Sequence, residues 1–405
     1  MPKELKKVLL NYYIYAALLG TWFASAVWLF FSRKFATDAQ VGVIDAVAFA
    51  IALLVEIPAG TVADRLGRRK TVIVGTIIYG LGYGLWGLSV SKPMMAVSFV
   101  IYWVGSAIMS GSDDAMLFEY LKAKGHEHIW QRVSTDRFII TRASMILAVF
   151  VGGLLYNAQE RLPFFARTAT FALMLIPLAR LKVVDKYQPK HSGENSFLRD
   201  LKTGIKEILL PEISWVLPIY LAVQGVGFAT FTSGILRPIL YGESGIKTSQ
   251  VSTYMAVSIL ISIVFMLVGS WRYKKLFFSK FCIYGLIALM VAGFLVNLPD
   301  NMMLAFAGLT CITISAYALH PILSNAINAA ISSRYRATTL SAASFCENAT
   351  YIVLAPAMGY LSAKGSIREI IYVCSGIVGC GGIASLLLRL RLHKKQTKLS
   401  SVAIV

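Results

Sequence analysis

The chain has 405 residues, of which 57% are hydrophobic and 15% are charged, and its mean hydropathy is +0.66. Soluble domains carry about 25% charged residues, so this composition excludes a soluble protein and predicts an all-α membrane protein. A net charge of +19 is also found in nucleic-acid-binding proteins, but those gather their cations on a soluble face, whereas here the cations flank apolar segments.

Twelve apolar segments are each long enough to cross a bilayer as a helix, which takes ~20 residues. Their approximate ranges are 8–31, 39–60, 71–90, 94–121, 137–157, 162–181, 209–235, 248–270, 276–298, 302–326, 336–362 and 368–389. Alternate loops, counted from the N-terminus, hold 29 of the 39 lysines and arginines, the opposite loops hold 9, and Arg142 lies within a span. By the positive-inside rule, we predict an integral plasma (inner) membrane protein with both termini in the cytoplasm.

The first span follows three lysines, as in a secretory signal peptide, but its apolar run continues to Phe31. We therefore interpret it as an uncleaved anchor. The longest polar interruption divides the spans six and six. We predict an N-terminal bundle over 1–181, a cytoplasmic central loop over 182–208, a C-terminal bundle over 209–390 and a cytoplasmic tail over 391–405.

A glycine pattern in the third span, Gly82-Tyr-Gly84-Leu-Trp-Gly87, fits the spacing of a dinucleotide-binding turn. No strand precedes it and no acidic residue follows at the required distance. We expect these small residues to form a packing face between helices instead.

The second and third spans are joined by a distinctive stretch, Gly60-Thr-Val-Ala-Asp64-Arg65-Leu-Gly67-Arg68-Arg69-Lys70. It resembles the loop signature G-x-x-x-D-R-x-G-R-[RK] of the major facilitator superfamily. The lead-in that begins at Glu56 is similar to bacterial drug-efflux members, although the fifth span reads Ala148-Val-Phe-Val-Gly152-Gly153 where antiporters often carry G-P-x-x-G-G. The matching loop of the second half, Gly269-Ser-Trp-Arg-Tyr-Lys-Lys275, lacks the aspartate and the second glycine.

This resemblance implies two pseudo-symmetric six-helix bundles with a substrate site between them near mid-membrane. It also implies that Asp64 faces the start of the eleventh span. Arg68 is expected to pair with an acidic residue at the base of the fourth span, for which Glu119 is the match. These contacts would lock the outward-open state and break as the two halves move, so we interpret the motif as a gate.

Two carboxylates lie in the second span, where an ionised side chain is costly and therefore marks a candidate functional site. Asp45 and Glu56 are eleven residues apart, which places them within about 20° of one helix face. Glu56 either takes part in proton coupling or braces the signature loop.

The fourth span carries Asp113 and Asp114, and the fifth carries Arg142 at a similar depth. We expect one of these aspartates to pair with Arg142. Such a pair is either a proton-coupling site, whose ionisation changes with its surroundings, or a permanent ion pair that fixes helix register. Glu347 in the eleventh span has no partner nearby in sequence, so it either neutralises Arg142 or carries a proton.

The family resemblance makes spans one, four, seven and ten line the cavity. Candidate substrate contacts are polar and aromatic residues of three of these spans: Asn11, Tyr15, Trp22, Gln224, Phe228, Tyr317, His320 and Asn325. Each also has an ordinary structural interpretation as a packing or hydrogen-bonding residue.

We predict a secondary active transporter that exports amphipathic small molecules or drugs by proton-coupled alternating access. The alternatives are a proton-coupled importer or facilitator of a small nutrient, and a membrane sensor that does not transport. The sequence has no nucleophile, base and orienter set of an enzyme, and its five cysteines lack metal-ligand or disulfide spacing. The expected partners are a small-molecule substrate, protons and the lipid bilayer, with no cofactor, metal or nucleic acid, and the chain is expected to act as a monomer.

Overall fold

The computed structural model describes residues 2–110, 112–181, 202–203, 206–211, 213–231, 234–243, 246, 248–298, 301–331 and 336–402. Each of the twelve predicted spans has a helical counterpart within these ranges. Eight of the described helices are long and apolar enough to cross a membrane, and Ser214–Thr230 and Lys280–Leu295 are shorter apolar helices. Helices suit a bilayer because they satisfy every backbone polar group internally.

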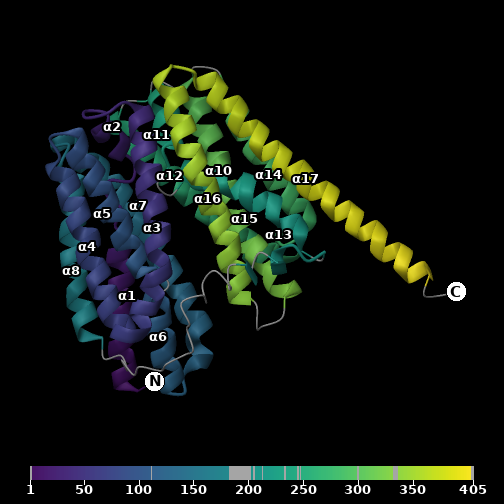
Figure 1. Cartoon of the computed structure of the whole chain (residues 1–405), viewed down its shortest axis with the longest axis horizontal. Helices are drawn as coiled ribbons and strands as arrows, with labels where there is room; N and C mark the ends of the chain where they lie inside the picture. Colours follow the sequence, from purple (N-terminus) through teal and green to yellow (C-terminus); the bar gives the residue numbers. More distant parts are fainter. Residues whose placement is uncertain are drawn as a thin grey trace. The chain divides into compact units, whose positions relative to one another are not determined.

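The chain divides into two compact units, Met1–Gly193 with Lys247–Ala256, and Glu194–Ile246 with Val257–Val405. The first unit contains α1 (Lys3–Leu19), α2 (Trp28–Ser32), α3 (Asp38–Leu66), α4 (Arg68–Leu88), α5 (Lys92–Met109), α6 (Ser112–Ala123), a 3₁₀ turn (Glu127–Ile129), α7 (Trp130–Ala158) and α8 (Leu162–Arg180) (Figure 1). The predicted central loop over 182–208 lies largely outside the described residues.

The other helices are a 3₁₀ turn (Ser214–Val216), a π-helical segment (Ile219–Gln224), α10 (Gly225–Phe231), α11 (Leu236–Glu243), α12 (Thr248–Arg272), α13 (Lys274–Phe277), α14 (Lys280–Leu295), α15 (Met302–Ala330), α16 (Arg336–Ala363) and α17 (Ile367–Val402). The first residues of α12 group with the first unit. Figure 1 shows α17 as one long helix, so most of the predicted tail over 391–405 continues the last span as helix.

The glycines of the third span allow close packing of α4 against its neighbours. A Cβ on Gly82 would lie 2.5 Å from the backbone nitrogen of Tyr102 on α5, and a Cβ on Gly105 would lie 2.4 Å from that of Tyr79 on α4. A Cβ on Gly80 would lie 2.9 Å from the Cβ of Phe171 on α8. The prediction of a small-residue packing face is therefore confirmed, and Figure 1 shows α4, α5 and α8 side by side.

The first span is not one continuous helix, because α1 ends at Leu19 and α2 begins at Trp28. Buried Arg167 of α8 caps the break: its guanidinium donates to the carbonyls of Leu18, Leu19 and Thr21 at 2.9–3.2 Å. A cation and backbone donors suit the end of α1, where carbonyls lack helical partners. The sequence count, which placed Arg167 among the loop residues, was wrong because this arginine lies inside the helix bundle.

The signature stretch also differs from the predicted loop. Helix α3 runs through Leu66 and α4 begins at Arg68, so Gly67 alone separates them. Gly67 has φ 93° and ψ 137°, a conformation that a residue with a side chain adopts only under strain. The predicted second span, 39–60, agrees with the apolar part of α3, but the helix continues beyond it through polar Asp64 and Arg65 to Leu66.

Candidate functional site

A cluster of charged and phenolic side chains joins three helices of the first unit. Arg137 on α7 donates through Nη2 to Asp113 and through Nη1 to Asp114, both on α6. Tyr12 and Tyr15 on α1 complete it: the Tyr12 hydroxyl donates to Asp114 Oδ1 at 2.8 Å, and the Tyr15 hydroxyl donates to Asp113 Oδ2 at 3.4 Å. We call these five residues the carboxylate cluster.

A break in the fourth span positions the two aspartates. Helix α5 ends at Met109 and α6 begins at Ser112, so Asp113 and Asp114 lie in the first turn of a helix. The unpaired N–H groups and positive end of the helix dipole favour carboxylates there. The backbone nitrogen of Asp114 donates to Asp113 Oδ1 at 2.9 Å, which uses one of those N–H groups.

The two carboxylates differ in accessibility. The side chain of Asp113 is 11% exposed and that of Arg137 is 19% exposed, whereas the side chain of Asp114 is 43% exposed. With both aspartates ionised, one guanidinium faces two carboxylates, and the cluster carries a net charge of −1. Taking up one proton or one monovalent cation makes the cluster neutral without removing Arg137.

The expected partner of the aspartates was wrong. Asp113 and Asp114 bind Arg137, while the guanidinium of Arg142 lies 5.2 Å from the ring centroid of Phe138. The apolar run of the fifth span starts at residue 137, so Arg137 was expected to be a flanking loop residue. Helix α7 in fact begins at Trp130, which carries Arg137 two turns into the helix.

Of the two tyrosines in the carboxylate cluster, only Tyr15 was among the candidates predicted from the sequence. Tyr15 was expected to contact substrate, but it is buried and bonds to Asp113. Tyr12 was missed, although its spacing of three from Tyr15 places both on one face of α1. Their rings lie 6.2 Å apart in a stacked arrangement. Among the other candidates of the first unit, Asn11 donates to the Lys7 carbonyl of its own helix at 2.9 Å, and Trp22 lies in the break after α1.

The two carboxylates of the second span do share a helix face, because both contact the fourth span. Asp45 is buried and accepts from Trp103 Nε1 at 2.7 Å. Glu56 accepts from the hydroxyl of Ser110 at 2.8 Å, at the break between α5 and α6. Glu56 therefore braces the helix break that positions Asp113.

The signature motif makes contacts through two of its arginines. Arg68 Nε donates to Glu119 Oε1 at 2.7 Å, so the pair expected from the resemblance is present, and both side chains are partly exposed. Arg69 donates to the carbonyls of Leu178 and Ala179 at 2.9 and 2.7 Å, capping the end of α8. Gly60, Asp64 and Arg65 lie on α3, but their surroundings, and the expected contact of Asp64 with the eleventh span, lie outside the described part.

In the second unit, the π-helical segment packs against α16, where the hydroxyl of Thr350 donates to the Leu221 carbonyl at 2.8 Å. Gln224 ends this segment and is buried, and its Nε2 has no hydrogen-bond partner among the described residues. Glu347 lies one turn before Thr350 on α16. Within the described part, no ion pair to Glu347 is present, so its expected neutralisation of Arg142 stays a prediction.

The remaining candidates of the second unit lie on α10 and α15. Phe228 packs edge-on against Tyr351 with ring centroids 5.2 Å apart, and Tyr317 is buried on α15. His320 and Asn325 are exposed on the same helix.

A buried arginine of the second unit, Arg237, was not among the residues predicted from the sequence. It donates to the hydroxyl of Thr313 at 2.5 Å. Across the described residues, no three His, Cys, Asp or Glu side chains are placed to hold a metal ion.

Comparisons with known proteins agree with this architecture. A family model described as Major Facilitator Superfamily matches residues 9–352. Multidrug resistance protein 1 of Bacillus subtilis (strain 168) is 26% identical over 186 residues, which are 46% of this chain and 46% of that protein. Quinolone resistance protein NorA of Staphylococcus aureus is 21% identical over 313 residues, which are 67% of this chain and 76% of that protein. The chain thus spans about half the length of the first relative.

Solved structures are similar over nearly the whole chain. A bacterial homologue of the human lysosomal transporter Spinster has a TM-score of 0.72 at 16% identity, covering 97% of this chain and 98% of that one. The nucleoside transporter NupG has a TM-score of 0.72 at 14% identity, covering 96% and 99%. At these identities the likeness concerns the fold alone. Because the family model matches most of its length, the chain belongs to the Major Facilitator Superfamily of membrane transporters.

Proposed function

We propose that this transporter exports amphipathic small molecules in exchange for protons, and that the carboxylate cluster couples the two. The observation that carries the proposal is that Asp113 and Asp114 share one arginine, Arg137. The cluster therefore has one negative charge in excess, which one proton or one cationic group neutralises. The drug-resistance relatives support a drug-like substrate.

The different exposure of the two aspartates supports different roles for them. Asp113 is the less exposed carboxylate and also accepts from Tyr15, so it keeps Arg137 in place. Asp114 is the more accessible, and we assign it the exchangeable proton. A proton on Asp114 and a cationic substrate beside it compete for the same excess charge, so binding of one favours release of the other.

The signature motif fits a reversible latch in this scheme. A partly exposed ion pair contributes about 1 kcal/mol or less, so the Arg68–Glu119 contact can break and form during each cycle. Arg69 caps α8 and keeps α4 fixed to that helix. The distribution of lysine and arginine supports cytoplasmic termini in an inner membrane. We propose that the chain works as a monomer.

The test is transport by purified protein in liposomes that hold a pH dye and an imposed acidic interior. We expect lipophilic cationic drugs added outside to dissipate the gradient. Asp114→Asn is expected to abolish this response, and Asp113→Asn to weaken it through loss of Arg137 positioning. Asp136→Asn is the matched control, because Asp136 lies on the same helix as Arg137 but bonds to Tyr13 and Arg132.

The same assay separates the alternatives. If a nutrient enters the liposomes together with protons from an acidic exterior, the protein is an importer and the exporter proposal is wrong. If no drug or nutrient changes the pH gradient, the result favours a membrane sensor that does not transport. A full drug response in Asp114→Asn would remove Asp114 from the coupling mechanism.

A further inference from the structure

The turn between α12 and α14 in the second unit is rich in cations and in exposed aromatic rings. Residues 271–281 contain four cations and no carboxylate: Arg272, Lys274, Lys275 and Lys280. Three of its aromatic side chains are exposed, with Trp271 at 86% and Phe281 at 75%. We call residues 271–281 the basic-aromatic turn.

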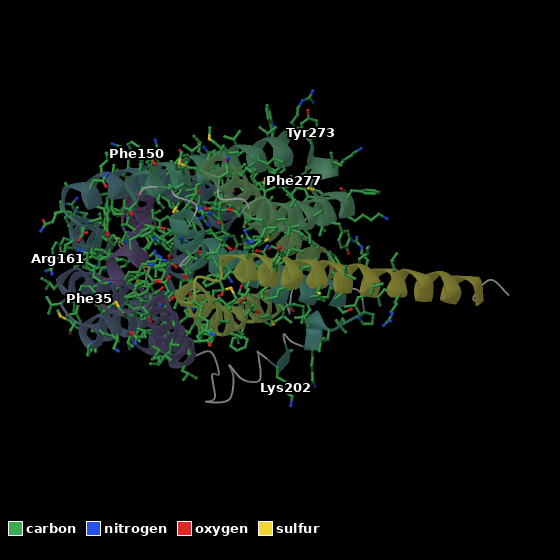
Figure 2. The ribbon with its side chains drawn as sticks, turned by 90° about the horizontal axis from the view of Figure 1, so that it is seen from above. Phe35, Phe150, Arg161, Lys202, Tyr273 and Phe277 are labelled. Atoms are coloured by element: carbon green, nitrogen blue, oxygen red, sulfur yellow. The ribbon has the colours of Figure 1, made fainter. Side chains whose placement is uncertain are left out.

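The turn is held in shape from inside by one aromatic residue. Phe277 is 3% exposed and packs against Gly269, where an added Cβ would lie 2.4 Å from its ring. The backbone nitrogen of Phe277 donates to the Tyr273 carbonyl at 2.8 Å. Figure 2 shows Tyr273 at the outer edge of the second unit and Phe277 closer to the helices. The exposed aromatics are therefore presented by a structured turn.

The corresponding stretch of the first unit treats its cations differently. There, Arg68 pairs with Glu119 and Arg69 caps the end of α8. The four cations of the basic-aromatic turn have no carboxylate partner among the residues the structure describes. The amine of Lys280 instead lies 5.8 Å from the ring centroid of Phe281. The cations of the second stretch are thus available to an external anion.

The turn lies where a membrane-spanning helix, α12, ends and apolar α14 begins, so it must lie at a membrane–water interface. Exposed tryptophan and tyrosine rings are favoured at the level of lipid headgroups. Juxtamembrane lysines and arginines attract anionic lipids. We propose that the basic-aromatic turn binds the headgroups of anionic phospholipids, with its cations on the phosphates and its exposed rings among the upper acyl chains.

Trp271 provides a direct test, because brominated lipids quench tryptophan only at contact. The protein is placed in nanodiscs, which expose both leaflets, containing either dibrominated phosphatidylglycerol or dibrominated phosphatidylcholine at equal mole fraction. Subtracting the emission of Trp271→Phe from that of each protein isolates Trp271. We expect phosphatidylglycerol to quench Trp271 several-fold more strongly, since each lysine near an anionic surface gives a preference of about fivefold.

The variant Lys274→Gln/Lys275→Gln, compared with its own Trp271→Phe version, is expected to bring the two quenching constants close to equality. The matched control is Lys122→Gln/Lys124→Gln, which removes two exposed lysines from the end of α6 and the turn after it. It is expected to keep the preference. In the wild type, raising salt to about 1 M, where charges are screened within about 3 Å, should remove most of the preference without any mutation.

Equal quenching by the two lipids in the wild type would overturn the proposal, as would a preference that survives Lys274→Gln/Lys275→Gln. Absence of Trp271 quenching by either lipid would also overturn it, because the turn would then lie away from the bilayer. None of these readouts requires transport, so they are independent of the proposed exporter function.

Discussion

Replacing Arg137 with glutamine removes the cation that contacts both aspartates of the carboxylate cluster. Removing one member of a buried ion pair costs about 3–5 kcal/mol, because it leaves an uncompensated charge. Asp113 and Arg137 are nearly buried, so the lower end of this range applies to their contact. Asp114 is more exposed and adds at most about 1 kcal/mol. We expect Arg137→Gln to lower the free energy of unfolding by about 3 kcal/mol.

A second substitution tests whether the charge balance causes this loss. Arg137→Gln alone changes the net charge of the cluster from −1 to −2. Adding Asp113→Asn restores −1 and removes the buried carboxylate that lost its partner. The double variant is therefore expected to regain about 2 kcal/mol relative to Arg137→Gln, within the range of interaction energies between residues in contact.

The assay is unfolding of the purified protein in detergent by a titrated denaturant, followed by tryptophan emission, for the wild type, both single variants and the double variant. The proteoliposome pH assay on the same four proteins reports coupling. Because Asp114 remains, the double variant is expected to recover part of the drug response. Additive effects of the two substitutions on stability would refute the shared-charge reasoning. Full transport by Arg137→Gln would refute the role of the cluster in coupling.

Three further substitutions probe other parts of the fold. Arg167→Met leaves three carbonyls in the break after α1 without their buried donor and is expected to cost about 3 kcal/mol in unfolding free energy. Arg161→Met, in the loop before α8, is expected to change it by less than about 0.5 kcal/mol. Gly67→Ala is expected to lower the free energy of unfolding by about 1–2 kcal/mol, because Gly67 has a positive φ. Its control is Gly376→Ala in α17, where no atom lies within 4 Å of the added Cβ. This control is expected to leave the stability unchanged or to raise it in the same denaturant titration. Glu119→Gln is expected to change the transport rate while altering stability by less than about 1 kcal/mol, and the exchanged pair Arg68→Glu/Glu119→Arg to restore the rate.

The helices of this protein were predictable because the bilayer imposes a strong constraint on sequence. About twenty apolar residues in a row have few alternatives to a spanning helix, so each of the twelve segments found a counterpart. The Arg68–Glu119 contact was also expected, but from the motif rather than from geometry. The shared face of Asp45 and Glu56 followed from helical periodicity, since their spacing of eleven residues is close to three turns.

The breaks inside spans were not predictable, because apolarity hardly changes across them. The first span is interrupted after Leu19 although no proline stands there, and the interruption is stabilised by Arg167, about 150 positions further along the chain. The fourth span breaks at Ser110, where Glu56 of another helix bonds to the hydroxyl. In both cases a long-range polar contact stabilises the local backbone, and a hydropathy pattern contains no such contact.

Hydropathy also failed to predict that Arg137, and not Arg142, is the partner of the two aspartates. An arginine inside a span is conspicuous, whereas an arginine at the edge of an apolar run looks like an ordinary flanking charge. Helix α7 extends seven residues before Arg137, so the edge of the apolar run is not the edge of the helix. Position along a span therefore predicts charge pairing poorly near its ends. In this protein the polar chemistry lies where helices begin or extend beyond the apolar run: Asp113 and Asp114 lie in the first turn of α6, after a break inside the fourth span, and Arg137 meets them from the extended part of α7.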